Sequence, residues 1–170
     1  MPAIENEFGT SHVAGLQVTH RGGGLLAGHF GHVCVAVWST KPTWALFEQQ
    51  RAALANSVQR HPGRSLFLCV VSSKADPPEQ DVRDASAKMI ISHDRQLAGC
   101  ACVIEGSGFR AAITRTVLTG ITLVVRTPAP FGFCDSVHAG YQWLGRYSPR
   151  GSLTGLVEEL TRARADEHAA

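Results

Sequence analysis

The sequence predicts an α/β domain with a mixed, largely parallel sheet of four to six strands covered by helices, and an extra C-terminal helix. Two observations support this prediction. Apolar runs of strand length alternate along the chain with segments whose apolar residues recur at helical spacing. Three of the runs are apolar throughout, as in strands buried on both faces: VCVAVW (33–38), LFLCVV (66–71) and LAGCACVI (97–104). We expect these three to lie side by side as inner strands.

The first half of the chain predicts strands followed by one long helix. Segment 14–20 is a short strand candidate, the glycines at 21–24 indicate a turn, and 25–39 holds one or two strands. Thr43 can cap a helix over 44–60, and Pro62-Gly63 ends it. Four apolar residues of this helix recur at helical spacing and are expected to face the core: Trp44, Phe47, Leu54 and Val58.

The second half predicts three further helices and a last strand. A helix over 81–96, with Asp81 as its expected cap, carries an apolar stripe. A second helix spans 108–120 and ends at a glycine, followed by a short apolar segment at 121–126. Residues 131–147 then give a short strand, a cap at Asp135 or Ser136, and a helix. The stripe of the first of these helices consists of Val82, Ala85, Met89 and Ile90.

The bulk composition is that of one globular domain. The 170 residues are 44% apolar and 18% charged, which suffices for a single domain with a substantial core. A net charge of +2 is too small to predict binding to nucleic acid or to a charged membrane surface. No apolar run approaches the roughly 20 residues of a membrane-spanning helix, and residues 1–15 lack the apolar stretch of a secretory signal. We therefore expect a cytoplasmic protein.

Six short motifs follow one another between about residues 25 and 147. In chain order they are HVCVAVWS, RHPG, SLFLCVVSS, DVRDASAKM, CACVIEGSGFRAAITR and FGFCDSVHAGYQWL. Their order resembles that of the SpoIIAA-like, or STAS, domains of bacteria, which are sometimes grouped with Sec14-like domains. The resemblance implies an N-terminal extension (1–20), a STAS/SpoIIAA-like domain (21–147), and a C-terminal amphipathic helix and tail (148–170).

The resemblance also implies a non-catalytic regulatory role. STAS domains commonly act as protein–protein switches, and in anti-sigma factor antagonists a serine after the central strand is phosphorylated. Here Ser72 and Ser73 fall at the end of that strand and Ser86 lies inside the following helix, so these serines are the phospho-switch candidates. The Asp-Ser-Ser-Gly-like stretch of the family is absent from the chain.

The loop after the central strand is the first candidate site for a protein partner. Segment 74–80 is polar and contains a double proline, which stiffens it for recognition. Ligands of open α/β sheets gather beyond the carboxyl ends of the strands, where this loop lies. Asp81, Arg83 and Asp84 in the first turns of the next helix are candidate contact residues, and a solvated surface loop is the alternative interpretation.

The Gly106-Ser107-Gly108 turn, with Arg110 after it, is the second candidate. Free N–H groups at the start of a helix attract anions, and an arginine adds positive charge. The alternative is that the two glycines only let the strand turn sharply into the helix. Glu105 argues against a strong anion site and is expected to pair with Arg110 or Arg115.

No metal or cofactor site is predicted. The chain has five cysteines, and those in apolar runs are expected to be reduced core thiols, with Cys100 and Cys102 on one face of a strand. His29 and His32 would point to opposite faces of a strand, and we interpret them as solvated or turn histidines. Neither pair completes the four ligands of a zinc site.

No catalytic constellation is predicted either. CDSVH (134–138) brings a thiol, a carboxylate and an imidazole together, but the adjacent Asp135 would raise the thiol pKa. Asp135 and Ser136 are better explained as helix caps. We therefore expect a protein that is not an enzyme.

Two functions remain open. The first is a regulatory module that binds a protein partner through the loops at 72–84 and 105–110. The alternative is a carrier of an apolar, lipid-like small ligand, and an apolar cavity under helices 79–95 and 108–120 would favour it. The tail helix has an apolar stripe, so we expect it to pack on its own chain or to form a homodimer; the stripe comprises Leu153, Leu156, Val157 and Leu160.

Overall fold

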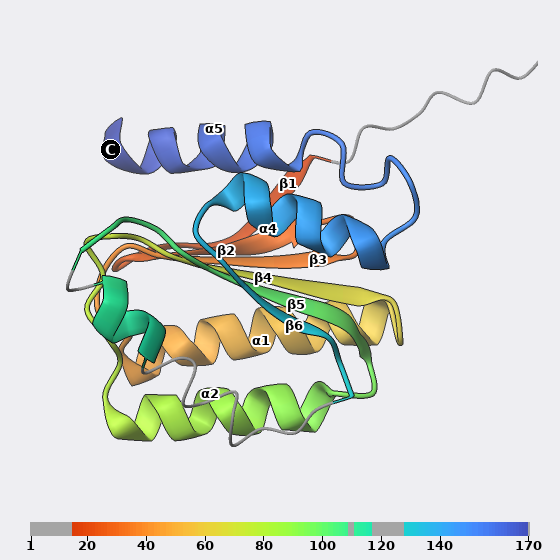
Figure 1. Ribbon diagram of the computed structural model, residues 1–170. Helices are drawn as coiled ribbons and strands as arrows, with labels where there is room; N and C mark the ends of the chain where they lie inside the picture. The colour runs from red at the N-terminus through yellow and green to blue at the C-terminus, as the bar shows by residue number, and fades with distance from the viewer. Residues whose placement is uncertain (1–14, 109–110, 117–127, 170) are drawn as a thin grey trace, which may run out of the picture.

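The computed structural model describes residues 15–108, 111–116 and 128–169. Its centre is a six-stranded sheet whose strands follow one another in chain order (Figure 1). The strands are β1 (Leu16–Gly22), β2 (Leu25–Phe30), β3 (Val33–Trp38), β4 (Ser65–Val71), β5 (Leu97–Ile104) and β6 (Phe131–Cys134). β1, β2 and β3 pair antiparallel, while β3, β4, β5 and β6 run parallel. The predicted mixed, largely parallel sheet is confirmed.

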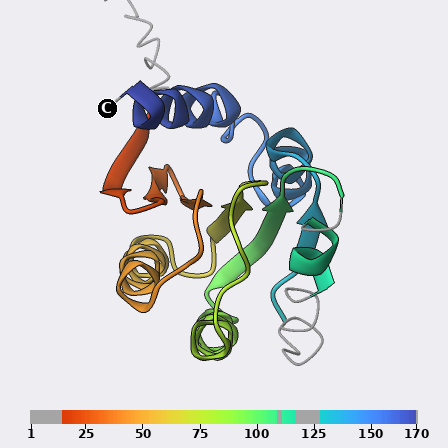
Figure 2. The same ribbon diagram turned by 90° about the vertical axis from the view of Figure 1, so that its left-hand side faces the viewer.

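Helices cover both faces of the sheet (Figures 1 and 2). We call the face covered by α1 (Trp44–Arg60) and α2 (Gln80–His93) the crossover face. The C-terminal face is covered by α4 (Val137–Leu144) and α5 (Leu156–Ala169), with a 3₁₀ turn at Gly145–Tyr147. Because the parallel strands advance in one direction, right-handed connections place the helices between them on the same side of the sheet. The helices after β6 are left to cover the other side.

The three apolar runs are the inner strands, as predicted. β3, β4 and β5 lie next to one another, with Val35 opposite Leu68 and Leu68 opposite Ala101 in register. Every residue of β3 is buried, as are all but Ala98 in β5 and all but Cys69 and Val71 in β4. Helices on both faces explain why these strands are apolar throughout.

Helix α1 begins and ends where the sequence predicts. The Thr43 hydroxyl accepts a hydrogen bond from the Leu46 amide at 3.4 Å, and Phe47, Leu54 and Val58 are buried. Trp44 was expected in the core, and this prediction is wrong, because its side chain is 50% exposed. It is the first residue of the helix, where one side of its ring rests on Phe47 and the other side meets solvent.

Both ends of the described chain pack against the sheet. β1 begins at Leu16, inside the segment that we assigned to an N-terminal extension, and pairs with β2 along its length. Three residues of the predicted apolar stripe, Leu153, Leu156 and Leu160, are buried on the C-terminal face and Val157 is half-buried, so the tail packs on its own chain, as one of the two expectations had it. The Arg21 side chain donates to the carbonyl of Ala163 at 2.7 Å, and the Leu16 amide donates to Glu159. α5 and β1 therefore belong to the same packed body as the central strands.

The structure corrects the expectation for one histidine. His29, expected in solvent or in a turn, is buried and its Nε2 lies 2.9 Å from the carbonyl oxygen of Ala53. That prediction is wrong for His29, because β2 is covered by α1.

Residues 111–116 form part of the helix expected over 108–120, while the segment 121–126 lies outside the described residues. Within the described residues, none of the helices combines the length and apolar content that a membrane crossing requires.

Candidate functional site

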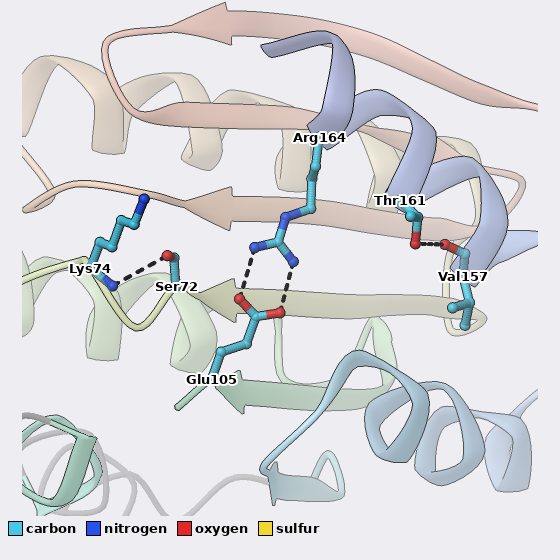
Figure 3. A network of polar contacts seen from close by, with 6 residues as sticks. All are labelled: Ser72, Lys74, Glu105, Val157, Thr161 and Arg164. Carbon is cyan, nitrogen blue, oxygen red and sulfur yellow. Dashed lines mark hydrogen bonds and ion pairs between the residues drawn. The ribbon is translucent and has the colours of Figure 1, made fainter. Parts of the chain in front are cut away.

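Hydrogen bonds of Ser72 hold the loop after β4 in place. The Ser72 amide donates to the carbonyl of Trp38 at 2.8 Å, which ties the end of β4 to the end of β3. The Ser72 hydroxyl accepts from the Lys74 amide at 3.3 Å (Figure 3). Ser72 is half-buried and Ser73 is exposed. The loop is thus an ordered part of the sheet's carboxyl edge, and the serines remain phospho-switch candidates.

The predicted contact residues at the start of α2 bond mainly to their own helix. The helix begins at Gln80 with Glu79 in the capping position, so the prediction that Asp81 caps it is wrong. The helix starts directly after the double proline at 77–78 and Glu79, which is earlier in the chain than a cap at Asp81 would place it. Asp81 accepts from the amide of the next residue, Val82, at 2.8 Å.

The other candidates on α2 form local hydrogen bonds as well. Arg83 donates to the side chain of Gln80 at 2.6 Å, and the Gln80 amide donates to Asp84 at 2.8 Å. The Ser86 hydroxyl donates to the carbonyl of Val82, one turn earlier. None of these bonds joins α2 to Ser72 or Ser73.

The Gly106-Ser107-Gly108 turn has a structural explanation. Gly106 and Gly108 have φ angles of 92° and 99°, which residues with a side chain rarely adopt. A Cβ atom on Gly106 would lie 2.7 Å from the Cβ of Ser73, so the turn also needs glycine to approach the β4 loop. Arg110 lies outside the described residues. The anion site stays a prediction, while the turn interpretation accounts for both glycines.

Glu105 is held by an arginine that no sequence pattern singles out. Both carboxylate oxygens of Glu105 accept from Arg164 of α5, at 2.7 and 2.8 Å (Figure 3). The prediction that Glu105 pairs with Arg115 is wrong, because Arg115 donates to the carbonyls of Ile104 and Gly106 instead. Arg164 lies 59 residues from Glu105 in the chain. The contact fastens α5 to the carboxyl end of β5.

An apolar cavity of about 90 Å³ lies on the crossover face, beneath α2 and the helix at 111–116. Its floor is the sheet: Trp38, Phe67, Cys69, Cys100, Cys102 and Phe131. Its other walls include Phe47 and Gln50 of α1, Val82, Met89 and Ile90 of α2, and Thr114. Residues 76–78 of the loop after β4 line it too, so the cavity borders the predicted partner-binding loop. This is the cavity that the ligand-carrier alternative called for.

Two of the thiols in the cavity floor, Cys100 and Cys102, have raised pKa values. Cys100 and Cys102 lie on one face of β5, as predicted, and Cys69 is directly opposite Cys102 in the sheet. Burial raises the pKa of the Cys100 thiol to about 12. A hydrogen bond with Cys69, followed by burial, raises the pKa of Cys102. At neutral pH these groups act as small apolar side chains rather than nucleophiles.

One polar pair stands out in the cavity wall. Gln50 and Trp38 are both buried, and the Trp38 indole N–H donates to the Gln50 side-chain oxygen at 2.7 Å. Gln50 lies on the buried side of α1, between Phe47 and Leu54. We did not single it out from the sequence; a glutamine inside an apolar helical stripe was the available signal.

The CDSVH segment does not assemble a nucleophile. Ser136 caps α4 by accepting from the Ala139 amide at 3.2 Å, which confirms the cap interpretation. The His138 ring lies beside the side chain of Gln142, at 3.1 Å. Burial, and then the charge of Asp135, raise the pKa of the Cys134 thiol, which disfavours the reactive thiolate.

The described residues hold no group of three or more histidine, cysteine or acidic side chains that could bind a metal ion. His32 lies at the β2–β3 turn, where its Nε2 is 2.8 Å from the Ser148 hydroxyl oxygen. His29 points into the core instead.

No family model matches the chain, and no curated protein matches it. Among solved structures, the chain is similar to an uncharacterized protein of the DUF3478 family with a SpoIIAA-like fold, from Shewanella loihica PV-4. The two share 14% sequence identity with a TM-score of 0.49, over 79% of this chain and 98% of the other. The fold named for that protein is the one that the sequence resemblance implied. At this identity and TM-score the similarity says nothing about function, and the function proposed below is based on the cavity.

Proposed function

We propose that this protein binds a small, largely apolar molecule in the cavity of the crossover face and serves as a carrier or sensor of that molecule. The observation that supports the proposal is the cavity itself, which lies under α2 and the helix at 111–116. A space of about 90 Å³ has room for several water molecules or for a small ring or short chain. Apolar walls favour the ring or chain, because burying apolar surface is worth about 25 cal/mol per Å².

The position of the cavity agrees with this role. Trp38, Val71 and Cys102 line it from the carboxyl-terminal halves of three parallel strands. Ligands of open α/β sheets collect at this end of the strands. The loop at 76–78 lies beside the cavity, so a bound molecule would touch a segment that a protein partner could also reach.

A binding role without catalysis is part of the proposal. Its support is that Cys100 and Cys102 in the cavity floor have raised pKa values, as has Cys134. A raised pKa keeps a thiol protonated at neutral pH, and the protonated form is a poor nucleophile.

The proposal is tested with a hydrocarbon probe and one methyl signal. The chain has two methionines, Met1 and Met89, and Met89 lines the cavity. With methyl-labelled methionine, titration of the full chain with isobutene should shift the Met89 signal, which Met89→Leu assigns. Cys69→Leu fills the floor and should weaken probe binding at least ten-fold.

The matched control is Cys134→Leu, the same substitution on β6 outside this cavity. It should leave the affinity for the probe unchanged within two-fold. A Met89 signal that does not move, or a Cys69→Leu variant that binds like the wild type, would contradict the proposal. Native mass spectrometry of protein purified from its own host should also find a bound apolar molecule.

A protein-interaction module is the second candidate, and one observation favours it. The loops after β4 and β5 meet at the carboxyl edge, where Gly106 approaches Ser73 and Ser107 is exposed. A partner that spans both loops should be captured from the native organism by the wild type and lost on Ser107→Arg. The exposed Thr154→Arg, away from this edge, should retain it. Equal capture by both variants would argue against this surface.

A further inference from the structure

The orientation of the Gln50 amide is fixed by its neighbour. The Trp38 indole N–H can only donate, so the Gln50 atom that lies 2.7 Å from it must be the side-chain oxygen. The Nε2 group of Gln50 is therefore turned to another direction, with two N–H donors to satisfy. Trp38 and Gln50 are only 3% and 5% exposed, so bulk water is a poor partner for them.

Within the part of the chain that the structure describes, no acceptor pairs with these two N–H groups. Among those residues, Arg83 Nε is the side-chain nitrogen that is fully inaccessible to solvent and also lacks a hydrogen-bond partner. Gln50 Nε2 does not combine these two properties. Nε2 therefore keeps some accessible surface. Because Gln50 lines the cavity and is otherwise buried, that surface faces the cavity.

The other residues that line the cavity limit which ligands could accept a hydrogen bond from Gln50 Nε2. Asp76 is the one charged side chain among the described residues of the lining, and none of these residues offers a positive charge, so a buried anion is disfavoured by the cost of desolvation. The Ser86 hydroxyl already donates to the carbonyl of Val82. Apart from Thr114, the rest of the described lining is mainly aliphatic, aromatic and thiol side chains.

We propose that Gln50 selects the ligand: the cavity takes a neutral, largely apolar molecule with one acceptor oxygen, such as a ketone, aldehyde or ester, whose oxygen accepts from Gln50 Nε2. This inference rests on the proposed function and names the chemical class of its ligand. A buried donor left unpaired is unfavourable, so an analogue without the oxygen binds more weakly than its apolar surface alone predicts.

Three probes of similar size separate the classes. Acetone carries a carbonyl, isobutene replaces the carbonyl oxygen with a methylene group, and acetate carries an anionic carboxylate. Each is titrated into the full chain, with the Met89 methyl signal reporting occupancy and the side-chain amide signals of Gln50 reporting the hydrogen bond. Acetone should shift the Gln50 amide protons downfield, isobutene should not, and acetate should bind most weakly.

Substitution at Gln50 removes the effect of the probes' different solubilities. Gln50→Met keeps the length of the side chain and a weak acceptor for Trp38, but has no donor. The ratio of the acetone affinity to the isobutene affinity should fall about ten-fold in this variant, the factor that one net hydrogen bond supports. Gln50→Glu, measured above neutral pH, keeps a strong acceptor for Trp38 and should lower the same ratio.

The outcomes distinguish the two proposals. If no probe moves the Met89 signal, the cavity does not bind ligands and both proposals fail. If acetone and isobutene both bind, but Gln50→Met and Gln50→Glu leave the ratio of their affinities unchanged, the cavity is a binding site and the role of Gln50 is overturned. Tighter binding of acetate than of acetone would overturn the neutral ligand class alone.

Discussion

The two faces of the sheet are built from alternate residues of the same strands, yet the apolar cavity lies on one of them, the crossover face, while aliphatic side chains of the described strands fill the other. On the C-terminal face, the inner strands present mainly branched aliphatic side chains: Val33, Val35, Val37, Leu66, Leu68, Val70 and Val103. On the crossover face, the same strands present several small ones: Cys34, Ala36, Cys69, Cys100 and Cys102. Three of these small side chains, Cys69, Cys100 and Cys102, line the apolar cavity.

This difference shows that an apolar pattern fixes where strands lie but not how densely each face is packed. Cavities in protein cores cost about 24 cal/mol per Å³, so 90 Å³ corresponds to about 2 kcal/mol of lost stability. A ligand that binds the folded state restores stability in proportion to the logarithm of its concentration over Kd. The unfilled face is therefore the one on which a function is expected.

Truncation on the filled face should have the largest effect. Leu68 is fully buried on the C-terminal face, and Leu68→Ala should lower the free energy of unfolding by about 3 kcal/mol. Its neighbour Cys69 lines the cavity, so Cys69→Ala should cost less than about 1 kcal/mol. Urea denaturation under reducing conditions measures both. Equal losses would mean that the two faces are packed alike.

The turn at the carboxyl edge should be sensitive at one glycine more than at the other. Gly106→Ala meets both an unfavourable φ and the Cβ of Ser73, and should destabilise the fold by about 2 kcal/mol. Gly108→Ala has a similar φ but open space around it, so about 1 kcal/mol is expected. Thermal unfolding of the two variants side by side decides this. The idea of a close approach between the loops fails if Gly108→Ala is the worse variant.

The Glu105–Arg164 pair should contribute less. Both side chains are roughly one quarter exposed and their contact is two-pronged, so Arg164→Leu should cost about 1 kcal/mol. Arg162→Leu is the matched control, because its pair with Glu159 lies within one helix and its own side chain is 70% exposed. We expect at most about 0.5 kcal/mol there. Amide exchange should rise in α5 for Arg164→Leu and stay unchanged for the control.

The smallest effect concerns pH. Burial, and then the charges of His61 and Arg64, lower the pKa of His32 in the folded state. Between the folded pKa and the unfolded value near 6.5, the unfolded chain binds more protons, so stability rises with pH through this window. It is lost progressively as the pH falls below about 6.5. His32→Gln should flatten the slope, and an unchanged slope in urea denaturation at several pH values would assign it elsewhere.

Local patterns predicted the fold, because strands and caps are local features. The three inner strands followed from uninterrupted apolar runs, and Thr43 and Ser136 were recognised as caps from their places before helical segments. Trp44 was misplaced because helical spacing does not reveal which end of a stripe lies beyond the core. Asp81 was wrongly predicted as the cap, because the helix begins at Gln80, directly after the double proline and Glu79. Asp81 is therefore already its second residue.

The site was harder to predict, because it depends on contacts between distant segments. The cavity was expected as the mark of a ligand carrier, but its volume depends on how α1, α2 and the sheet meet. The partner of Glu105 comes from a helix beyond the motifs of the resemblance. The role proposed for Gln50 depends on its hydrogen bond with Trp38, which lies 12 residues earlier in the chain.

A crystal of the protein held under xenon pressure tests the central claim most directly, because xenon enters apolar cavities large enough to hold it. The account predicts a xenon atom on the crossover face between Cys69, Met89 and Phe131, and none between the sheet and α4 or α5. The absence of xenon beneath α2, or its presence on the C-terminal face instead, would contradict it.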